Sequence, residues 1–174
     1  MADRILRRVE NALGAVSGLA LASMVVLMGA EVVARYVLAS PLSWSVGVVS
    51  NYLMIGFFFL GLPMTVREGA HVAIDVVYDR LPPALQPWCD RLAAATGLVF
   101  LLAVAVGGVL LTVDVAGGGY APPAGSAELS WPVWTSTVMV PLGALVAATR
   151  LALFLAGAVP VTAPDAEPTI SEVR

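Results

Sequence analysis

The sequence is poor in charge and contains no lysine. Only 12% of its 174 residues are charged and 59% are hydrophobic, whereas a soluble domain carries roughly a quarter charged residues. The nine basic residues are all arginines, and the net charge of −3 leaves no basic excess for binding nucleic acid. These scarcities indicate a membrane protein and exclude a nucleic-acid-binding one.

Cysteine and histidine are almost absent. The single cysteine, Cys89, precludes an intramolecular disulfide and a cysteine-based metal cluster. The single histidine, His71, rules out the paired axial histidines of a bis-histidine haem. On a helix, His71, Asp75 and Asp79 would line one face, but ligands spread along two turns are not typical of a metal site. We therefore expect no cofactor, no metal ion and no catalytic residues.

Long apolar runs are what the sequence does contain. Four stretches hold no charged residue, namely 12–30, 36–66, 92–113 and 129–149. A charge at the bilayer centre is costly, and a span needs about 20 apolar residues. Pro41 excludes the start of the second stretch from its helix. The predicted fold is an all-α membrane protein, a single domain over 1–159 with four transmembrane helices at about 12–34, 46–66, 92–114 and 133–159.

The arginines predict the orientation of these spans. Seven of them precede the first span, lie between the second and third, or follow the fourth: Arg4, Arg7, Arg8, Arg67, Arg80, Arg91 and Arg174. The other side has Arg35 alone, so the positive-inside rule places both termini in the cytoplasm. We expect the first span to be retained rather than cleaved as a signal peptide. Residues 160–174 hold three prolines and three acids, which predicts a disordered cytoplasmic tail.

The segment between the second and third spans predicts a short interfacial helix. Ile74, Val77, Tyr78 and Leu81 would form its apolar face, opposite the polar face that carries His71. Such an amphipathic helix would lie on the cytoplasmic membrane surface and stop at the prolines at 82–83.

Few polar side chains lie within the spans. Glu31 and Arg35 are four residues apart and can pair on one helix face, which favours a structural pair or a subunit contact over a proton relay. Arg150 lies about 14 Å inside the inner end of the fourth span. That depth is far for snorkelling, so we expect Arg150 to contact a partner or a lipid head group.

Backbone features of the last two spans also lead to expectations. Ala103, Gly107 and Gly108 would allow another helix to approach the third span closely. Pro141 should kink the fourth span.

The order of the motifs resembles the small membrane subunit of tripartite ATP-independent periplasmic (TRAP) transporters, the DctQ type. The most specific motif is Arg-x-Gly-x-His-x-x-x-Asp at 67–75, directly after a span. The other matching motifs are Arg35-Tyr36, Pro-Leu-Ser-Trp at 41–44, Phe-Leu-Gly at 59–61, Leu81-Pro82, Trp134, Pro-Leu-Gly at 141–143 and Arg150. Together they cover essentially all of residues 1–159.

The resemblance implies a scaffold subunit of a secondary importer in the bacterial inner membrane. The substrate and sodium sites would lie in a separate large permease subunit of the DctM type, and a periplasmic solute-binding protein of the DctP type would deliver small organic acids or related solutes. Membrane lipids would be the remaining partners. Seven residues are the candidates for subunit contact or assembly: Glu31, Arg35, Trp44, Arg67, His71, Asp75 and Arg150.

One feature departs from the family pattern. Acidic residues commonly follow the motif tryptophan, but Ser45, Val46 and Gly47 follow Trp44. If those acids contact the partner subunit in the family, Glu31 or Glu128 would have to replace them here.

Two alternatives remain open at the level of sequence. The chain could be a membrane anchor of a respiratory complex that binds quinone or haem, although the lone His71 outside the spans argues against haem. It could also be a small exporter with Glu31 as its proton carrier, in which case Glu31→Gln would abolish substrate-dependent proton movement in vesicles.

The scaffold interpretation predicts that His71 matters for assembly rather than for substrate affinity. The substitution His71→Ala should lower the yield of the purified complex, because the motif directly after the second span would no longer fold or dock correctly. Quantitative co-purification measures this. An unchanged yield with an altered substrate preference would contradict it.

Overall fold

A computed structural model describes residues 2–68, 82, 85–118 and 131–158. Within these residues every regular element is a helix, and no strand is present. Four helical segments are long and apolar enough to cross a membrane: Asp3–Tyr36, Ser45–Arg67, Gln86–Ala116 and Trp134–Leu155. The predicted all-helical fold with four spans is therefore confirmed. The expected interfacial helix and the tail at 160–174 lie outside the described residues.

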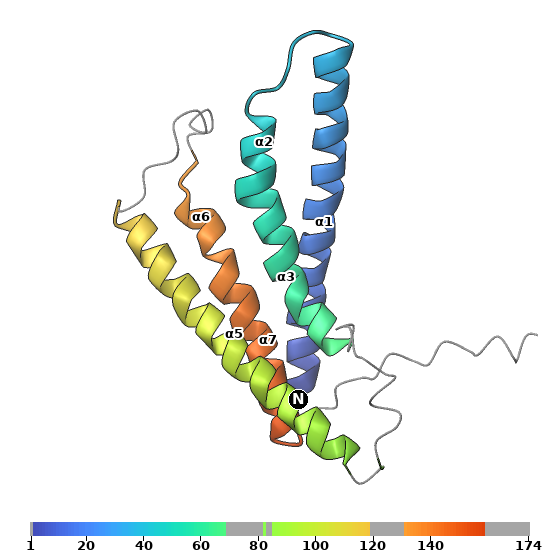
Figure 1. The fold of residues 1–174 in the computed structure, drawn as a ribbon, viewed down its shortest axis with the longest axis vertical. Coiled ribbons are helices and arrows are strands. Elements are labelled where there is room, and N and C mark those ends of the chain that lie inside the picture. Colours follow the sequence, from blue (N-terminus) through green and yellow to red (C-terminus); the bar gives the residue numbers. More distant parts are fainter. Residues whose placement is uncertain (1, 69–81, 83–84, 119–130, 159–174) are drawn as a thin grey trace, which may run out of the picture.

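The first two spans form a long hairpin. Helix α1 (Ala2–Tyr36) has 35 residues, or about 52 Å at the usual helical rise, and it exceeds a hydrocarbon core of about 30 Å. The second span consists of α2 (Ser45–Val48), the π-helical segment η1 (Val49–Leu53) and α3 (Met54–Arg67). It begins only after Pro41, as expected, and the end of the hairpin projects beyond the neighbouring helices (Figure 1).

The last two spans form a second hairpin. Helix α5 (Gln86–Ala116) is continuous, whereas the fourth span is divided into α6 (Trp134–Thr137) and α7 (Met139–Leu155). The interruption at Val138 lies three residues before Pro141, whose ring crowds the carbonyl four residues earlier. Pro141 is expected to kink the fourth span. The structure has an interruption of the helix instead, on the N-terminal side of Pro141.

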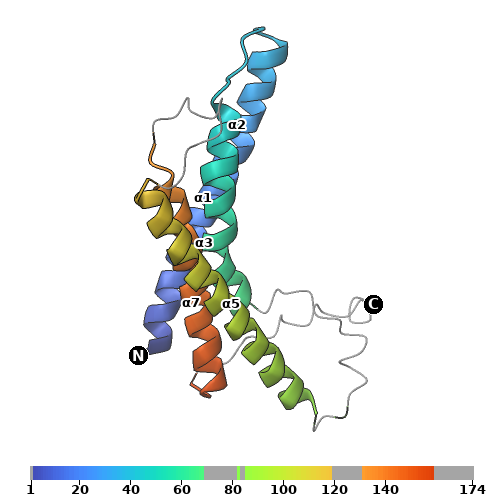
Figure 2. The same cartoon turned by 60° about the vertical axis from the view of Figure 1, so that its left-hand side comes forward.

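The four spans lie in a row rather than in a closed bundle. The main contacts join α1 to α3, α3 to α7, and α7 to α5, so α1 and α5 are the two edges of the row (Figures 1 and 2). The edge helices keep large apolar side chains exposed, including Val26 at 71% and Leu92 at 70%. The row therefore presents broad apolar surfaces, as a membrane protein does to lipid or to partner helices.

The packed centre of the row lies around α7. Its buried positions are mostly small, and Ala144, Ala147 and Ala148 are almost completely covered. Ala147 and Ala148 cluster with Val66 of α3 and Leu101 of α5. Small side chains allow helix backbones to approach closely in membranes, where van der Waals packing replaces the hydrophobic effect.

The closest approach of α3 and α7 occurs at Gly143. A Cβ atom at Gly143 would lie 1.9 Å from the carbonyl oxygen of Phe59. Pro63 lacks the N–H group that would bond this carbonyl in a regular helix. The proline and the glycine are thus complementary, because one frees a backbone carbonyl and the other lets a neighbouring helix pack against it.

Only one of the three small residues singled out in the third span makes a close approach. A Cβ atom at Gly108 would lie 2.8 Å from Cδ of Pro141, so Gly108 packs directly on α7. Gly107 has open space around it, and Ala103 is exposed. These two residues are on the outward face of an edge helix, so no described helix of this chain packs closely against them.

The crossing at Gly143 leads to a stability prediction. Gly143→Ala should lower the thermal unfolding temperature of the purified protein in detergent, because the Phe59 backbone cannot move aside. The loss in free energy of unfolding should reach or exceed the roughly 1–3 kcal/mol typical of overpacking. The matched control is Gly107→Ala on α5, which adds the same methyl group into open space. The control should be neutral or slightly stabilising, since alanine is the better helix former. Equal unfolding temperatures for the two variants would contradict the close crossing.

Candidate functional site: polar networks at the two ends of the helix row

A buried ion pair joins the first and last spans. Both Glu10 of α1 and Arg150 of α7 have no exposed surface. Nε and Nη2 of Arg150 donate hydrogen bonds to the two carboxylate oxygens of Glu10, with an Nη2 to Oε2 distance of 2.9 Å. The planar guanidinium and the carboxylate therefore meet in a bidentate pair, the strongest arrangement available to these groups.

Arg67, at the end of α3, extends this pair into a network of three helices. Its Nη1 atom lies 3.5 Å from Oε2 of Glu10 and donates a hydrogen bond to the side-chain oxygen of Asn11. Its Nε and Nη2 atoms lie 2.8 and 2.7 Å from Oε1 of Glu68. Glu10 is thus placed between two arginines, and α1, α3 and α7 are tied together at one end.

The edge of this inner network is less tightly paired. Asp3 accepts a hydrogen bond from Nε of Arg7 at 2.8 Å, one turn further along α1, and lies 3.7 Å from Nη2 of Arg150. Nη1 of Arg150 and Oδ1 of Asp3 are buried without a hydrogen-bond partner among the described residues. The inner network thus has no net charge, because it contains three acids and three arginines: Asp3, Glu10, Glu68, Arg7, Arg67 and Arg150.

A second polar network lies at the opposite end of the hairpin. Glu31 is 5% exposed, and its Oε1 atom accepts hydrogen bonds from Nη2 and Nε of Arg35 at 2.6 and 3.1 Å. Its Oε2 atom accepts the backbone N–H of Leu42 at 2.7 Å. Ser45 donates its hydroxyl to the carbonyl of Leu42 at 2.8 Å. Glu31 therefore fixes the loop between α1 and α2 against the end of α1.

The loop held in this way carries Trp44. Trp44 directly precedes α2 and is 39% exposed, and the Arg35 side chain is 53% exposed. The three residues that follow Arg35 in the chain are also largely exposed: Tyr36, Val37 and Leu38. We call Arg35, the residues 36–38 and Trp44 the hairpin tip. It combines one basic side chain with an apolar surface on a rigid support.

The predicted site residues thus separate into two groups. Glu31 pairs with Arg35 and holds the loop that carries Trp44, and Arg67 and Arg150 both lie beside Glu10 in the inner network. His71 and Asp75 lie outside the described residues. Glu31 is buried and bonded within the chain, so it does not present the surface acid that is missing after Trp44.

Arg150 has a counter-ion within its own chain. Sequence reasoning treated Glu10 only as the boundary of the first span and therefore missed the pair. The available signal was an arginine inside one span and an acid just before another on the same side, because buried charges in membranes are usually paired.

The described residues suit structural ion pairing. No group of three or more His, Cys, Asp or Glu side chains among them is placed to hold a metal ion. The acids of the two networks are bonded to arginines and backbone groups, and both networks lie toward helix ends rather than at the middle of the spans.

Comparison with known proteins adds one match. The family model for tripartite ATP-independent periplasmic transporters, DctQ component, matches residues 24–160. No curated protein matches the chain. The matched region begins within α1 and includes the last three spans.

The inner network predicts unequal effects of removing two arginines. Arg150→Met should destabilise the purified protein by about 3–5 kcal/mol, because it leaves the Glu10 carboxylate buried without its main partner. Arg7→Met, which removes an exposed pair within α1, should change stability by about 1 kcal/mol or less. Thermal unfolding in detergent measures both. The double variant Glu10→Gln with Arg150→Met should recover part of the loss, and equal effects of the two single changes would refute the buried pair.

Proposed function

Because the chain belongs to the DctQ family of TRAP transporter small permease subunits, we propose that it is the scaffold subunit of a sodium-driven importer of small organic acids or related solutes. In this proposal a large permease subunit carries the solute and ion sites, and a periplasmic binding protein delivers the solute. The small subunit holds the large one in the bilayer and contributes no residue to the transport path.

The observation that carries this proposal is the location of the polar groups. A transport path normally places ionisable or unwound polar groups near the bilayer midplane. In the described part of this chain, the buried charges of the spans pair with one another near the helix ends, Glu10 with Arg150 and Arg67 at one end and Glu31 with Arg35 at the other. The charged residues of α5, namely Asp90, Arg91 and Asp114, lie within a few residues of its two ends. A chain that uses its charges for its own packing is suited to support a transporting partner.

We further propose that both termini lie in the cytoplasm. The N-terminal end of α1 and the C-terminal end of α3 lie at the same end of the row (Figure 1). The first carries Arg4, Arg7 and Arg8 and the second carries Arg67, whereas Arg35 is in the last turn of α1, at the other end. This distribution agrees with the positive-inside rule. The hairpin tip then faces the periplasm.

Within this orientation the seven assembly candidates take two different roles. We assign Arg35 and Trp44 to contact with a partner, because Arg35 in the last turn of α1 and Trp44 on the fixed loop are both exposed. Glu31, Arg67 and Arg150 act inside the chain and affect assembly through its folding. His71 and Asp75 remain candidates for assembly on the motif alone.

Co-purification tests the scaffold role. When the chain is co-expressed with a large permease subunit of the DctM type from the same organism, the two should purify together in mild detergent. Trp44→Ala should lower the recovery of the large subunit even where the small subunit remains folded at the temperature of purification, because part of the Trp44 side chain is exposed at the hairpin tip. The matched control is Trp88→Ala at the start of α5, another exposed tryptophan, which should not change recovery.

The outcomes separate two claims. A wild-type chain that remains alone would contradict the scaffold role. If Trp44→Ala and Trp88→Ala lower the recovery of the large subunit equally, only the assignment of the hairpin tip to partner contact would be contradicted.

A further inference from the structure

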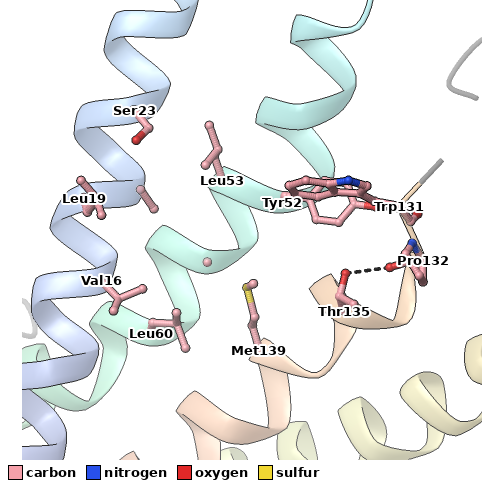
Figure 3. Close-up of a pocket in the computed structure, with 12 residues that line it drawn as sticks. Val16, Leu19, Ser23, Tyr52, Leu53, Leu60, Trp131, Pro132, Thr135 and Met139 are labelled. Carbon is pink, nitrogen blue, oxygen red and sulfur yellow. Dashed lines mark hydrogen bonds between the residues drawn. The ribbon is translucent and has the colours of Figure 1, made fainter. Parts of the chain in front are cut away.

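An open apolar groove lies on one face of the row, between α1, the η1–α3 segment and α6–α7. Its volume is about 610 Å³, within the range of about 300–1,000 Å³ that is usual for ligand sites. Figure 3 shows side chains from the three segments around one space, with Val16 and Leu19 of α1 opposite Met139 of α7. Tyr52 and Trp131 lie together at one end.

The lining offers hydrocarbon and no charge. Two of its three hydroxyl groups are used within the protein, since Tyr52 donates to the carbonyl of Trp131 at 3.0 Å and Thr135 donates to the carbonyl of Pro132 at 2.7 Å. Apart from Ser23, the other lining side chains are apolar. A charged ligand would find no counter-ion, and water would find too few polar partners to occupy the space. Charge complementarity therefore selects an uncharged, apolar occupant.

The groove is large enough for part of one lipid chain. On α1 its lining runs from Val16 to Ser23, about 10 Å of helix, compared with about 15 Å for half of the hydrocarbon core. On the other side it runs from Trp131, just before α6, to Met139 at the start of α7. A methylene group is about as large as a water molecule, whose share of liquid volume is about 30 Å³, so a chain of about 16 carbons needs about 480 Å³.

The aromatic end of the groove indicates which way the chain runs. Tyr52 and Trp131 pack edge to face with ring centroids 5.9 Å apart. Tyrosine and tryptophan are enriched where the hydrocarbon meets the head groups. A lipid chain would enter past this pair and extend toward the bilayer centre, where Leu60 and Met139 close the groove.

We propose that this groove binds one acyl chain of a membrane phospholipid, with the head group beyond the Tyr52–Trp131 pair. Left empty, the lining would lose its dispersion contacts on one side. The bound chain completes the packing where α1 and α7 diverge over α3. The phospholipid is thus a structural ligand of this subunit, distinct from the lipid that exchanges freely around the row.

Native mass spectrometry with a groove-filling variant tests the proposal. The wild-type chain, purified in mild detergent from cells, should retain one phospholipid. Ala20→Phe places an aromatic ring in the groove and should abolish the phospholipid-bound peak. Ala22→Phe makes the same change on an exposed part of α1 outside the lining, and it should retain the peak.

Photo-crosslinking provides a second measurement that needs no variant. A phospholipid with a diazirine at the end of one acyl chain, reconstituted with the wild-type chain, should label peptides that contain Leu60 and Met139 above those with the exposed Val99 and Phe100 of α5. Uniform labelling, retention of phospholipid by Ala20→Phe, or recovery of a quinone or of no lipid would each overturn the proposal. Loss of groove labelling when the large subunit is co-reconstituted would assign the groove to a partner helix instead.

Discussion

The buried pair of Glu10 and Arg150 is the contact on which the arrangement of the helices depends. It joins residues 140 positions apart in the chain, and it links two helices that are not the main neighbours in the row. Both side chains are fully buried, and a buried charge that loses its main partner is costly, so helix arrangements that separate Glu10 from Arg150 are disfavoured. Arg67 places α3 in the same network, and the order of α1, α3 and α7 is thereby defined at one end.

The number and type of helices could be predicted from the sequence because they follow from local properties. The distribution of charge marks the four spans, Pro41 marks a position that the second span cannot include, and Pro141 marks the irregular start of α7. The pair of Glu31 and Arg35 could also be predicted, since residues four apart on a helix face the same way. These predictions need no knowledge of how one helix packs on another.

Features that depend on contacts between helices could not be predicted in the same way. The partner of Arg150 lies on a distant helix, and several acids on the same side of the membrane were possible counter-ions. The sequence shows that Gly107 and Gly108 are adjacent and small, but only the packing of α5 on α7 decides that Gly108 faces inward. The close contact of Gly143 with Phe59 likewise requires the register of α3 against α7, which the apolar pattern leaves undetermined.

An arrangement of helices in a row, rather than in a ring, means that the subunit encloses no lumen. In the proposed scaffold role, the solute moves through the large subunit, and the described helices of this chain present one of their faces to it. The helices fix the height of such a subunit across the bilayer. One face can remain packed against a partner that moves while the other face stays in contact with lipid. The subunit can then set the direction in which the partner moves without moving itself.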